Sequence, residues 1–419
     1  MEEIPFHRPF IGKEEEEAVL RVLRSGWLTT GKEALAFEEE FRDFLVKDNQ
    51  PSGGTASGPP DGSLFCLAVN SATSGLHLAL EALGVGPGDA VFLPSYTFTA
   101  TAEVVRYLGA EAVFVDIAPD SYNMDGKALE EAVLRLNHTG VAAGGIKDEV
   151  NSTGPKAVIA VHVGGLPCDM EAVNGIARKY GLSVVEDAAH AFPARTAPRE
   201  GPADCTHPMP FAGTAGDVGV FSFYATKTIT TGEGGMVVTK REDASRRIAV
   251  MRSHGIDRPV WNRYTDSSAS WYYEVVAPGF KYNLPDLLAA VGRVQLRRAL
   301  DLLAMREAIA ERYDRAFENE GALITPPPGG ARHLYALRLR EPDKRDALVE
   351  SLRKKGIGTS VHYIPLHLMP YYRSRYNHKP EDFPQSLARF KETISLPIWP
   401  GMTHSQIDRV IEAVLQVSS

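Results

Sequence analysis

Short apolar runs alternate with amphipathic helical patterns along roughly the first half of the chain. Short buried strands separated by helices predict a mostly parallel sheet with helices on both faces. In such sheets ligands bind beyond the carboxyl ends of the strands, so polar residues that follow a strand are candidates for function. The predicted strands are 65–69, 90–93, 112–115, 157–161, 182–186 and 218–224, and the helices include 13–26, 32–47, 71–84 and 169–181.

The pattern changes from about Asn283 onward. A long helical pattern there is followed by a mixture of apolar runs and helices, which predicts a smaller C-terminal α+β domain. We therefore expect a large domain over 1–285 and a smaller one over 286–419. The predicted elements are a helix over 284–321, apolar runs at 333–339, 358–363 and 394–397, and helices over 343–356 and 404–416.

Three segments follow neither pattern: 48–63, 137–155 and 196–216. The first is rich in Gly, Pro and Ser, which is typical of a loop. Helical and strand patterns resume directly after it, so it is predicted to be a surface excursion and not a linker between domains.

Composition excludes several classes of protein. The chain of 419 residues has a net charge of −8, which argues against nucleic acid as its main partner. Its three cysteines are far apart and form no C-x-x-C pair, so neither a disulfide framework nor a metal site is expected. No apolar run approaches the ~20 residues of a membrane span, and the acidic N-terminus has no signal-peptide pattern. These features predict a cytoplasmic protein.

Four groups of polar residues come directly after predicted strands. They are 71–74, 95–99, 187–190 and 225–227. Taken alone, each has an ordinary explanation: a hydroxyl in the first group can be a helix N-cap, and so can Asp187. Phe98 can belong to the core, and His190 can be a hydrogen-bonded structural histidine. No G-x-x-x-x-G-K-[ST] loop is present, and no G-x-G-x-x-G follows a strand.

Together the four groups supply what pyridoxal phosphate requires. This cofactor needs a Schiff-base lysine, a carboxylate against its pyridinium nitrogen, a phosphate-binding turn and usually an aromatic side chain against its ring. The free N–H groups of a helix N-terminus favour a phosphate. Glu186 and Asp187 should face opposite sides of their strand, so only one of them can reach the ligand.

The chain resembles the DegT/DnrJ/StrS family of nucleotide-sugar aminotransferases over nearly its whole length. The resemblance is carried by "NSATSGLHLAL", "PSYTFTATAEVVRYLGAEAVFVD", "VVEDAAHA", "FSFYATKTITTGEGGMVVT", "PGFKYNLPD" and "LRKKGIGTSVHY". It implies the pyridoxal-phosphate-dependent transferase fold type I of aspartate aminotransferase. It also implies transfer of an amino group from glutamate to a keto carbon of a nucleotide-linked sugar. Several motifs are most similar to members that act on a UDP-4-keto sugar.

The resemblance implies a role for each residue around the cofactor ring. Lys227 matches the lysine that forms the Schiff base and shuttles protons. Asp187 matches the partner of the pyridinium nitrogen, Phe98 stacks on the ring, and His190 lies near the edge that carries the ring oxygen.

The resemblance also implies which residues bind the phosphate of the cofactor. Ala72 and Thr73 supply backbone amides and Ser222 a hydroxyl, while Asn283 matches an asparagine that reaches the phosphate from the other subunit. A homodimer with shared active sites follows.

Tyr224 and His362 match positions near the mouth of the site, where the substrate binds. One alternative is a sugar dehydratase on the same fold, but that branch replaces the lysine with histidine. Another is a non-catalytic regulator that binds pyridoxal phosphate or a sugar, in which the pair of Asp187 and Lys227 would have no purpose.

Overall fold

A computed structural model describes residues 2–47, 64–139, 154–196, 210–257 and 272–418. The predicted excursion 48–63 and most of the other two low-pattern segments lie outside these residues. The strands are β1 (Phe65–Val69), β2 (Asp89–Pro94), β3 (Glu111–Val115), β4 (Gly154–Val161), β5 (Ser183–Asp187), β6 (Val218–Ser222), β7 (Gly235–Thr239), β8 (Leu323–Ile324), β9 (Tyr335–Leu339) and β10 (Thr393–Leu396).

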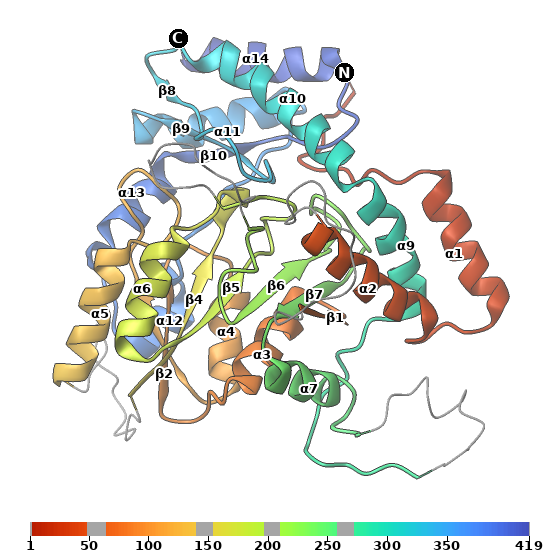
Figure 1. Ribbon diagram of the computed structural model, residues 1–419. Helices are drawn as coiled ribbons and strands as arrows, with labels where there is room; N and C mark the ends of the chain where they lie inside the picture. Colours follow the sequence, from red (N-terminus) through yellow and green to blue (C-terminus); the bar gives the residue numbers. More distant parts are fainter. Residues whose placement is uncertain (1, 48–63, 140–153, 197–209, 258–271, 419) are drawn as a thin grey trace.

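Helices precede, separate and follow these strands (Figure 1). They are α1 (Lys13–Ser25), α2 (Lys32–Lys47), α3 (Ala72–Ala82), α4 (Ala100–Tyr107), α5 (Gly126–Thr139), α6 (Met170–Tyr180), α7 (Glu242–Met251), α9 (Asp286–Arg297), α10 (Ala299–Phe317), α11 (Arg345–Lys354), α12 (Pro370–Tyr376), α13 (Pro384–Glu392) and α14 (His404–Ser418). Short 3-10 turns are η1 (Val163–Gly165), η2 (Pro342–Lys344), η3 (Leu366–Leu368) and η4 (Pro380–Asp382).

The central sheet has seven strands in the order β1-β7-β6-β5-β4-β2-β3. The neighbours from β6 to β3 are parallel, whereas β7 is antiparallel to both β6 and β1. The predicted mostly parallel sheet is therefore confirmed. The pattern missed β7, which follows a run of glycines and threonines and reverses the direction of the sheet.

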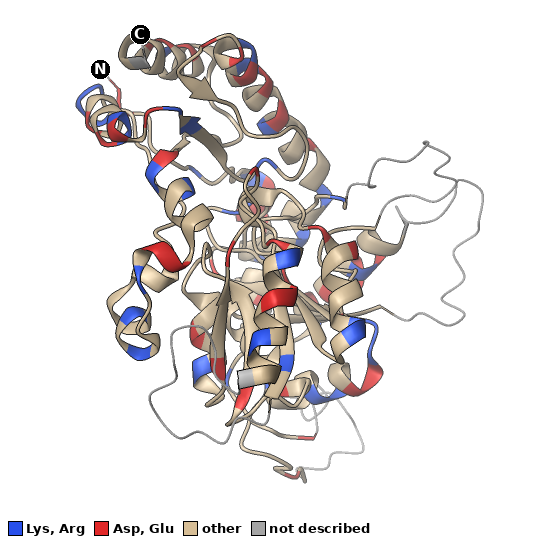
Figure 2. Cartoon of the chain, turned by 90° about the vertical axis from the view of Figure 1, so that its left-hand side faces the viewer, with Lys and Arg blue, Asp and Glu red and all other residues tan. Residues whose placement is uncertain are grey.

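Both faces of the central sheet are covered by helices, as the runs of apolar residues in its strands predicted. One apolar cluster joins one face to α3, α4 and α7, and another joins the opposite face to α5 and α6. A third cluster packs α2 against β1, β6 and β7. Charged residues of both signs are spread over the surrounding helices, which fits the modest net charge (Figure 2).

A smaller antiparallel sheet, β10-β9-β8, has its own apolar cluster with α10, α11 and α14. Ile4 from the N-terminal segment also belongs to this cluster. The single helix expected over 284–321 is two helices, because Arg298 adopts non-helical backbone angles between α9 and α10. The extended run expected at 358–363 pairs only at Ser360, with Ser395. The division into 1–285 and 286–419 stays a prediction.

Helix α3 packs against the central sheet at Gly75, where there is no room for a side chain. A Cβ atom at Gly75 would stand 2.7 Å from Cγ1 of Val220 and 3.1 Å from Cγ2 of Val237. A contact of 2.7 Å requires the valine side chain or the helix to shift. The glycine thereby sets the height of the α3 N-terminus above the strand ends.

We expect Gly75→Ala to lower the denaturation midpoint, because overpacking at about 1–3 kcal/mol exceeds the ~0.5–1 kcal/mol that alanine gains in a helix. Gly175 in α6 is the matched control, since nothing lies within 4 Å of the position that a Cβ atom would take there. Gly175→Ala should raise the midpoint. Urea unfolding followed by circular dichroism measures both, and a midpoint for Gly75→Ala at or above that of the wild type would contradict the close packing.

Candidate active site

The strand ends bring the phosphate-binding residues of the prediction together. Val69 at the end of β1 pairs with Gly235 in β7, and Gly235 pairs with Ser222 at the end of β6. The turn after Val69 therefore begins beside Ser222. A Cβ atom on Gly235 would stand 2.8 Å from the backbone nitrogen of Ala72, so only glycine lets the strand approach this turn so closely.

The N-terminus of α3 offers two free backbone N–H groups. Ser71 is the N-cap and accepts a hydrogen bond from the Ser74 amide at 3.1 Å, while the Ser74 hydroxyl accepts one from the Ser71 amide at 3.2 Å. Among the hydrogen bonds of the described residues, none uses the amide of Ala72 or Thr73. Free amides at the positive end of a helix dipole form an anion site, and the hydroxyl of Ser222 lies at the same strand ends.

Lys227 lies just beyond β6, in a turn where its amide donates to the carbonyl of Tyr224 at 2.9 Å. Burial lowers the pKa of the Lys227 ammonium to about 8, an effect that the nearby Asp187 carboxylate opposes and that the Arg306 charge reinforces. A lysine with this pKa has an appreciable fraction of neutral, nucleophilic amine at neutral pH.

Asp187 ends β5 on the same edge of the sheet. Its carboxylate accepts hydrogen bonds from the Thr101 hydroxyl at 2.9 Å and from the Ala189 amide at 3.2 Å. Burial raises the pKa of Asp187, and these two hydrogen bonds together with the Lys227 charge work against that rise. These hydrogen bonds orient the Asp187 carboxylate so that it can pair with a cationic group.

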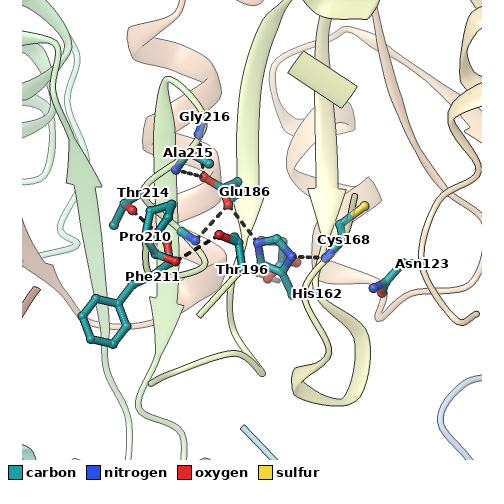
Figure 3. A network of polar contacts seen from close by, with 12 residues as sticks. Asn123, His162, Cys168, Glu186, Thr196, Pro210, Phe211, Thr214, Ala215 and Gly216 are labelled. Carbon is teal, nitrogen blue, oxygen red and sulfur yellow. Dashed lines mark hydrogen bonds and ion pairs between the residues drawn. The ribbon is translucent and has the colours of Figure 1, made fainter. Parts of the chain in front are cut away.

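Glu186 has a set of partners separate from those of Asp187, as the alternation along a strand predicts. Figure 3 shows the contacts of Glu186. Its two oxygens accept from the amides of Gly213, Ala215 and Gly216 at 2.6–2.9 Å. The ring of His162 lies 2.9 Å away and accepts at Nδ1 from the Cys168 amide, so its Nε2–H donates to Glu186. Glu186 is therefore fully engaged, and only Asp187 is left for a ligand.

His190 is held as a neutral imidazole. Its Nδ1 accepts from the Gly164 amide at 3.1 Å, which leaves Nε2–H to donate to the Tyr363 hydroxyl at 2.9 Å. Burial moves the pKa of His190 well below its ordinary value. The ring of Phe98 is 56% exposed and its centroid is 6.0 Å from that of Tyr363, so Phe98 presents a free aromatic face.

The two residues predicted at the mouth of the site differ in exposure. Tyr224 is 47% exposed. His362 is more enclosed: its Nδ1 lies 2.9 Å from the Ser395 hydroxyl and its ring stacks on Phe6. Burial lowers the pKa of His362 to about 4, helped by the charge of Lys227.

Asn283 lies beside the end of β1, where it forms an isolated bridge with Val69. Its side-chain amide donates to the Thr30 hydroxyl, and its oxygen accepts from Lys281 Nζ at 2.6 Å. From this position Asn283 could contact a ligand at the turn after β1 of its own chain or at the same turn of a second chain.

The sequence reasoning missed several residues of the site. Thr101 orients Asp187, Tyr363 contacts His190, and His7 binds the carbonyl of Ala225 through Nε2 at 2.7 Å. Thr101 belongs to the motif "PSYTFTATAEVVRYLGAEAVFVD", a few residues after the end of β2, so the sequence could have indicated it. Tyr363 and His7 reach the site only through the packing of the small sheet and the N-terminal segment. The described residues hold no group of His, Cys, Asp and Glu side chains that could bind a metal.

Comparison with known proteins identifies the chain as a pyridoxal-phosphate aminotransferase. The chain belongs to the DegT/DnrJ/EryC1/StrS aminotransferase family, whose family model it matches over residues 9–415. It is 40% identical to the spore coat polysaccharide biosynthesis protein SpsC of Bacillus subtilis, over 99% of this chain and 97% of SpsC. It is also 40% identical to an uncharacterized protein of Methanocaldococcus jannaschii, over 99% of this chain and 98% of that one.

Solved structures give the same result. Spr1654 of Streptococcus pneumoniae, assigned as a sugar aminotransferase, matches in its PLP form with a TM-score of 0.81 and 28% identity over 100% of this chain and 99% of that one. PseC of Helicobacter pylori, an aminotransferase involved in the biosynthesis of pseudoaminic acid, matches with a TM-score of 0.80 and 27% identity over 99% of both chains. The fold type I architecture and the pyridoxal phosphate cofactor are therefore confirmed.

The residues of this chain fit that cofactor. The free amides of Ala72 and Thr73 suit its phosphate, the buried carboxylate of Asp187 suits its protonated ring nitrogen, and the amine of Lys227 suits its aldehyde. The close approach of Gly235 to the turn gives the phosphate end its shape.

The lowered pKa of Lys227 predicts how cofactor binding depends on pH. Only the neutral amine attacks an aldehyde, and its fraction rises with pH until the pKa of about 8 is passed. We expect the rate constant for binding of pyridoxal phosphate by the cofactor-free protein to rise about tenfold per pH unit below pH 8 and to level off above it. Stopped-flow absorbance measures this rate, and a rise that continues to pH 10 would mean that Lys227 has an ordinary pKa.

Proposed function

We propose that this aminotransferase moves an amino group from glutamate to a keto carbon of a nucleotide-linked sugar, specifically a UDP-4-keto sugar. The observation that carries the proposal is the lysine with a lowered pKa, Lys227, at the same sheet edge as Asp187 and the phosphate-binding turn. Membership of a sugar aminotransferase family and the likeness to SpsC, a polysaccharide biosynthesis protein, support a sugar as the acceptor.

Lys227 and Asp187 would do the chemical work. When bound, pyridoxal phosphate supplies an electron sink that makes the carbon beside the amino group acidic. Lys227 Nζ would hold the cofactor and then carry the proton to and from that carbon, for which a pKa of about 8 is well suited. Asp187 would keep the ring nitrogen protonated, since opposite charges ~4 Å apart are worth about 4 kcal/mol at an effective dielectric of 20.

The remaining residues would bind the cofactor and orient its ring. Ala72, Thr73 and Ser222 would hold the phosphate, and Phe98 would stack on the ring. His190, fixed as a neutral imidazole by the Gly164 amide, can offer no positive charge to the oxygen edge of the ring.

Tyr224 and His362 would contact the sugar substrate at the mouth of the site. The exposed ring of Tyr224 is free to take part in such a contact. None of the helices that the structure describes has the length and apolar character needed to cross a bilayer. We place the enzyme in the cytoplasm, where nucleotide-linked sugars are made.

A panel of nucleotide-linked keto sugars tests the substrate class. Each sugar is incubated with the loaded enzyme and glutamate, and the product is followed by mass spectrometry. We expect amination of a UDP-4-keto sugar, with 2-oxoglutarate formed in equal amount, and no product from Lys227→Ala. Amination of other carbonyl compounds without any nucleotide-linked sugar would overturn the proposal.

We further propose a homodimer in which Asn283 completes the phosphate site of the other subunit. Asn283→Ala and Lys227→Ala should each be inactive, yet a heterodimer of the two has one site with both lesions and one with neither. Unfolding and refolding an equal mixture should restore about a quarter of the wild-type activity, because half the dimers are mixed and each has one intact site.

Tagged subunits and a pull-down confirm that the mixed dimers form. If they form and the activity stays at the sum of the two separate variants, Asn283 serves its own chain. The position of Asn283 beside Val69 makes that the specific alternative.

A further inference from the structure

The N-terminal segment ahead of α1 is fixed to the rest of the fold at two places. Ile4 is buried in the cluster of the small sheet, and its amide donates to the Gly356 carbonyl at 2.8 Å. Its carbonyl accepts from the Gly358 amide, also at 2.8 Å. Further along, the carbonyl of Phe10 accepts from the side-chain amide of Gln295 in α9 at 2.9 Å. The residues between these two anchors are therefore held at both ends.

Between the anchors, the N-terminal segment contacts two parts of the candidate site. The ring of Phe6 stacks on that of His362, with 5.4 Å between their centroids. The Nε2 of His7 lies 2.7 Å from the carbonyl oxygen of Ala225. Because a carbonyl only accepts, Nε2 carries the proton and donates it to this hydrogen bond. Ala225 is 218 positions from His7 and lies in the turn that leads to Lys227.

This turn presents Lys227 to the site. The Lys227 amide donates to the Tyr224 carbonyl at 2.9 Å, so residues 224–227 form a four-residue turn. The carbonyl of Ala225 belongs to the central peptide of the turn, and it accepts from His7. The turn's own hydrogen bond joins only its two ends, so a contact from outside to the central peptide restricts how the turn can move.

The His7 ring makes this contact without adding charge beside the lysine. Burial lowers the pKa of His7 to about 4, and the charges of Arg306 and Lys227 act in the same direction. The imidazole is therefore neutral at neutral pH and has a single N–H, which it donates to the Ala225 carbonyl.

We propose that His7 is a positioning residue of the active site, which places the Lys227 amine by holding the carbonyl of Ala225. This inference rests on the role proposed for Lys227 in binding the cofactor, and it deepens the proposed function. It makes the N-terminal segment a part of the site and connects the turn of Lys227 with the small sheet, where Ile4 is anchored.

The rate constant for covalent binding of pyridoxal phosphate by the cofactor-free protein tests the inference without turnover. At pH 9 most of the Lys227 amine is already neutral, because its pKa is about 8, so the rate constant reports where the amine lies. His7→Met and His7→Gln are a matched pair: their side chains are alike in length, and only glutamine keeps an N–H donor. We expect His7→Met to slow the step about tenfold, since a misplacement of ~1 Å can cost ~100-fold, and His7→Gln to stay within about twofold of the wild type.

A cofactor analogue without the aldehyde separates the position of Lys227 from a general effect on the site. The analogue 4′-deoxypyridoxine 5′-phosphate keeps the ring and the phosphate but cannot react with an amine, and calorimetry measures its affinity. We expect wild-type affinity in His7→Met. Weaker binding would mean that His7 supports the whole cofactor site, which overturns the inference. Arg8→Gln, a change at the exposed neighbouring residue, should leave both measurements at their wild-type values.

His7→Asn covers the case in which His7→Met does not fold. Its amide nitrogen takes the place of Nδ1 and not of Nε2, so it cannot reach the Ala225 carbonyl, and we expect the same slow binding. A wild-type rate constant in the folded variants overturns the inference. A rate constant for His7→Gln as low as that of His7→Met does so too, because the hydrogen bond is then not the cause.

The inference and the proposed function can fail separately, because the binding assay contains no sugar. Slow cofactor binding by His7→Met, without amination of any nucleotide-linked sugar by the wild type, contradicts only the substrate class. Amination of a nucleotide-linked sugar by the wild type, with a wild-type rate constant of cofactor binding in His7→Met, contradicts only the role of His7.

Discussion

The fully buried carboxylate of Glu186 fixes the strand end on which the active site depends. A buried charge is tolerated only when its partners are complete, and here His162 and three backbone amides surround it. These partners tie β4, β5 and the loop before β6 together. Because successive side chains of a strand alternate, the same constraint turns Asp187 toward Lys227. The fold thereby separates two adjacent acids into one structural and one functional group.

The two halves of the site come from different parts of the fold. The proposed phosphate end would be made by the α3 N-terminus and by Ser222, whose relative position follows from the register of β1, β7 and β6. The ring of His190 is contacted by Tyr363 and His333, which come from segments beside the small sheet.

Local patterns were sufficient to predict six of the seven strands of the central sheet and which polar residues lie at the strand ends. The strand at 65–69 has the predicted bounds. Asp187 is the last residue of β5 and Lys227 follows β6, and the direction of a parallel sheet places such residues at one edge. The break at Arg298 was not predictable, since its neighbours all favour a helix. Tyr363 was missed for another reason. The contact of Tyr363 with His190 joins residues 173 positions apart and depends on how the small sheet packs.

Chemical trapping of the cofactor tests the central claim most directly. The protein loaded with pyridoxal phosphate is reduced with borohydride, digested and mapped by mass spectrometry. We expect the reduced cofactor on the peptide that contains Lys227, and loss of that adduct in Lys227→Ala while the fold is kept. Reduced cofactor on another lysine, or no cofactor after reconstitution, would contradict the assignment of the site.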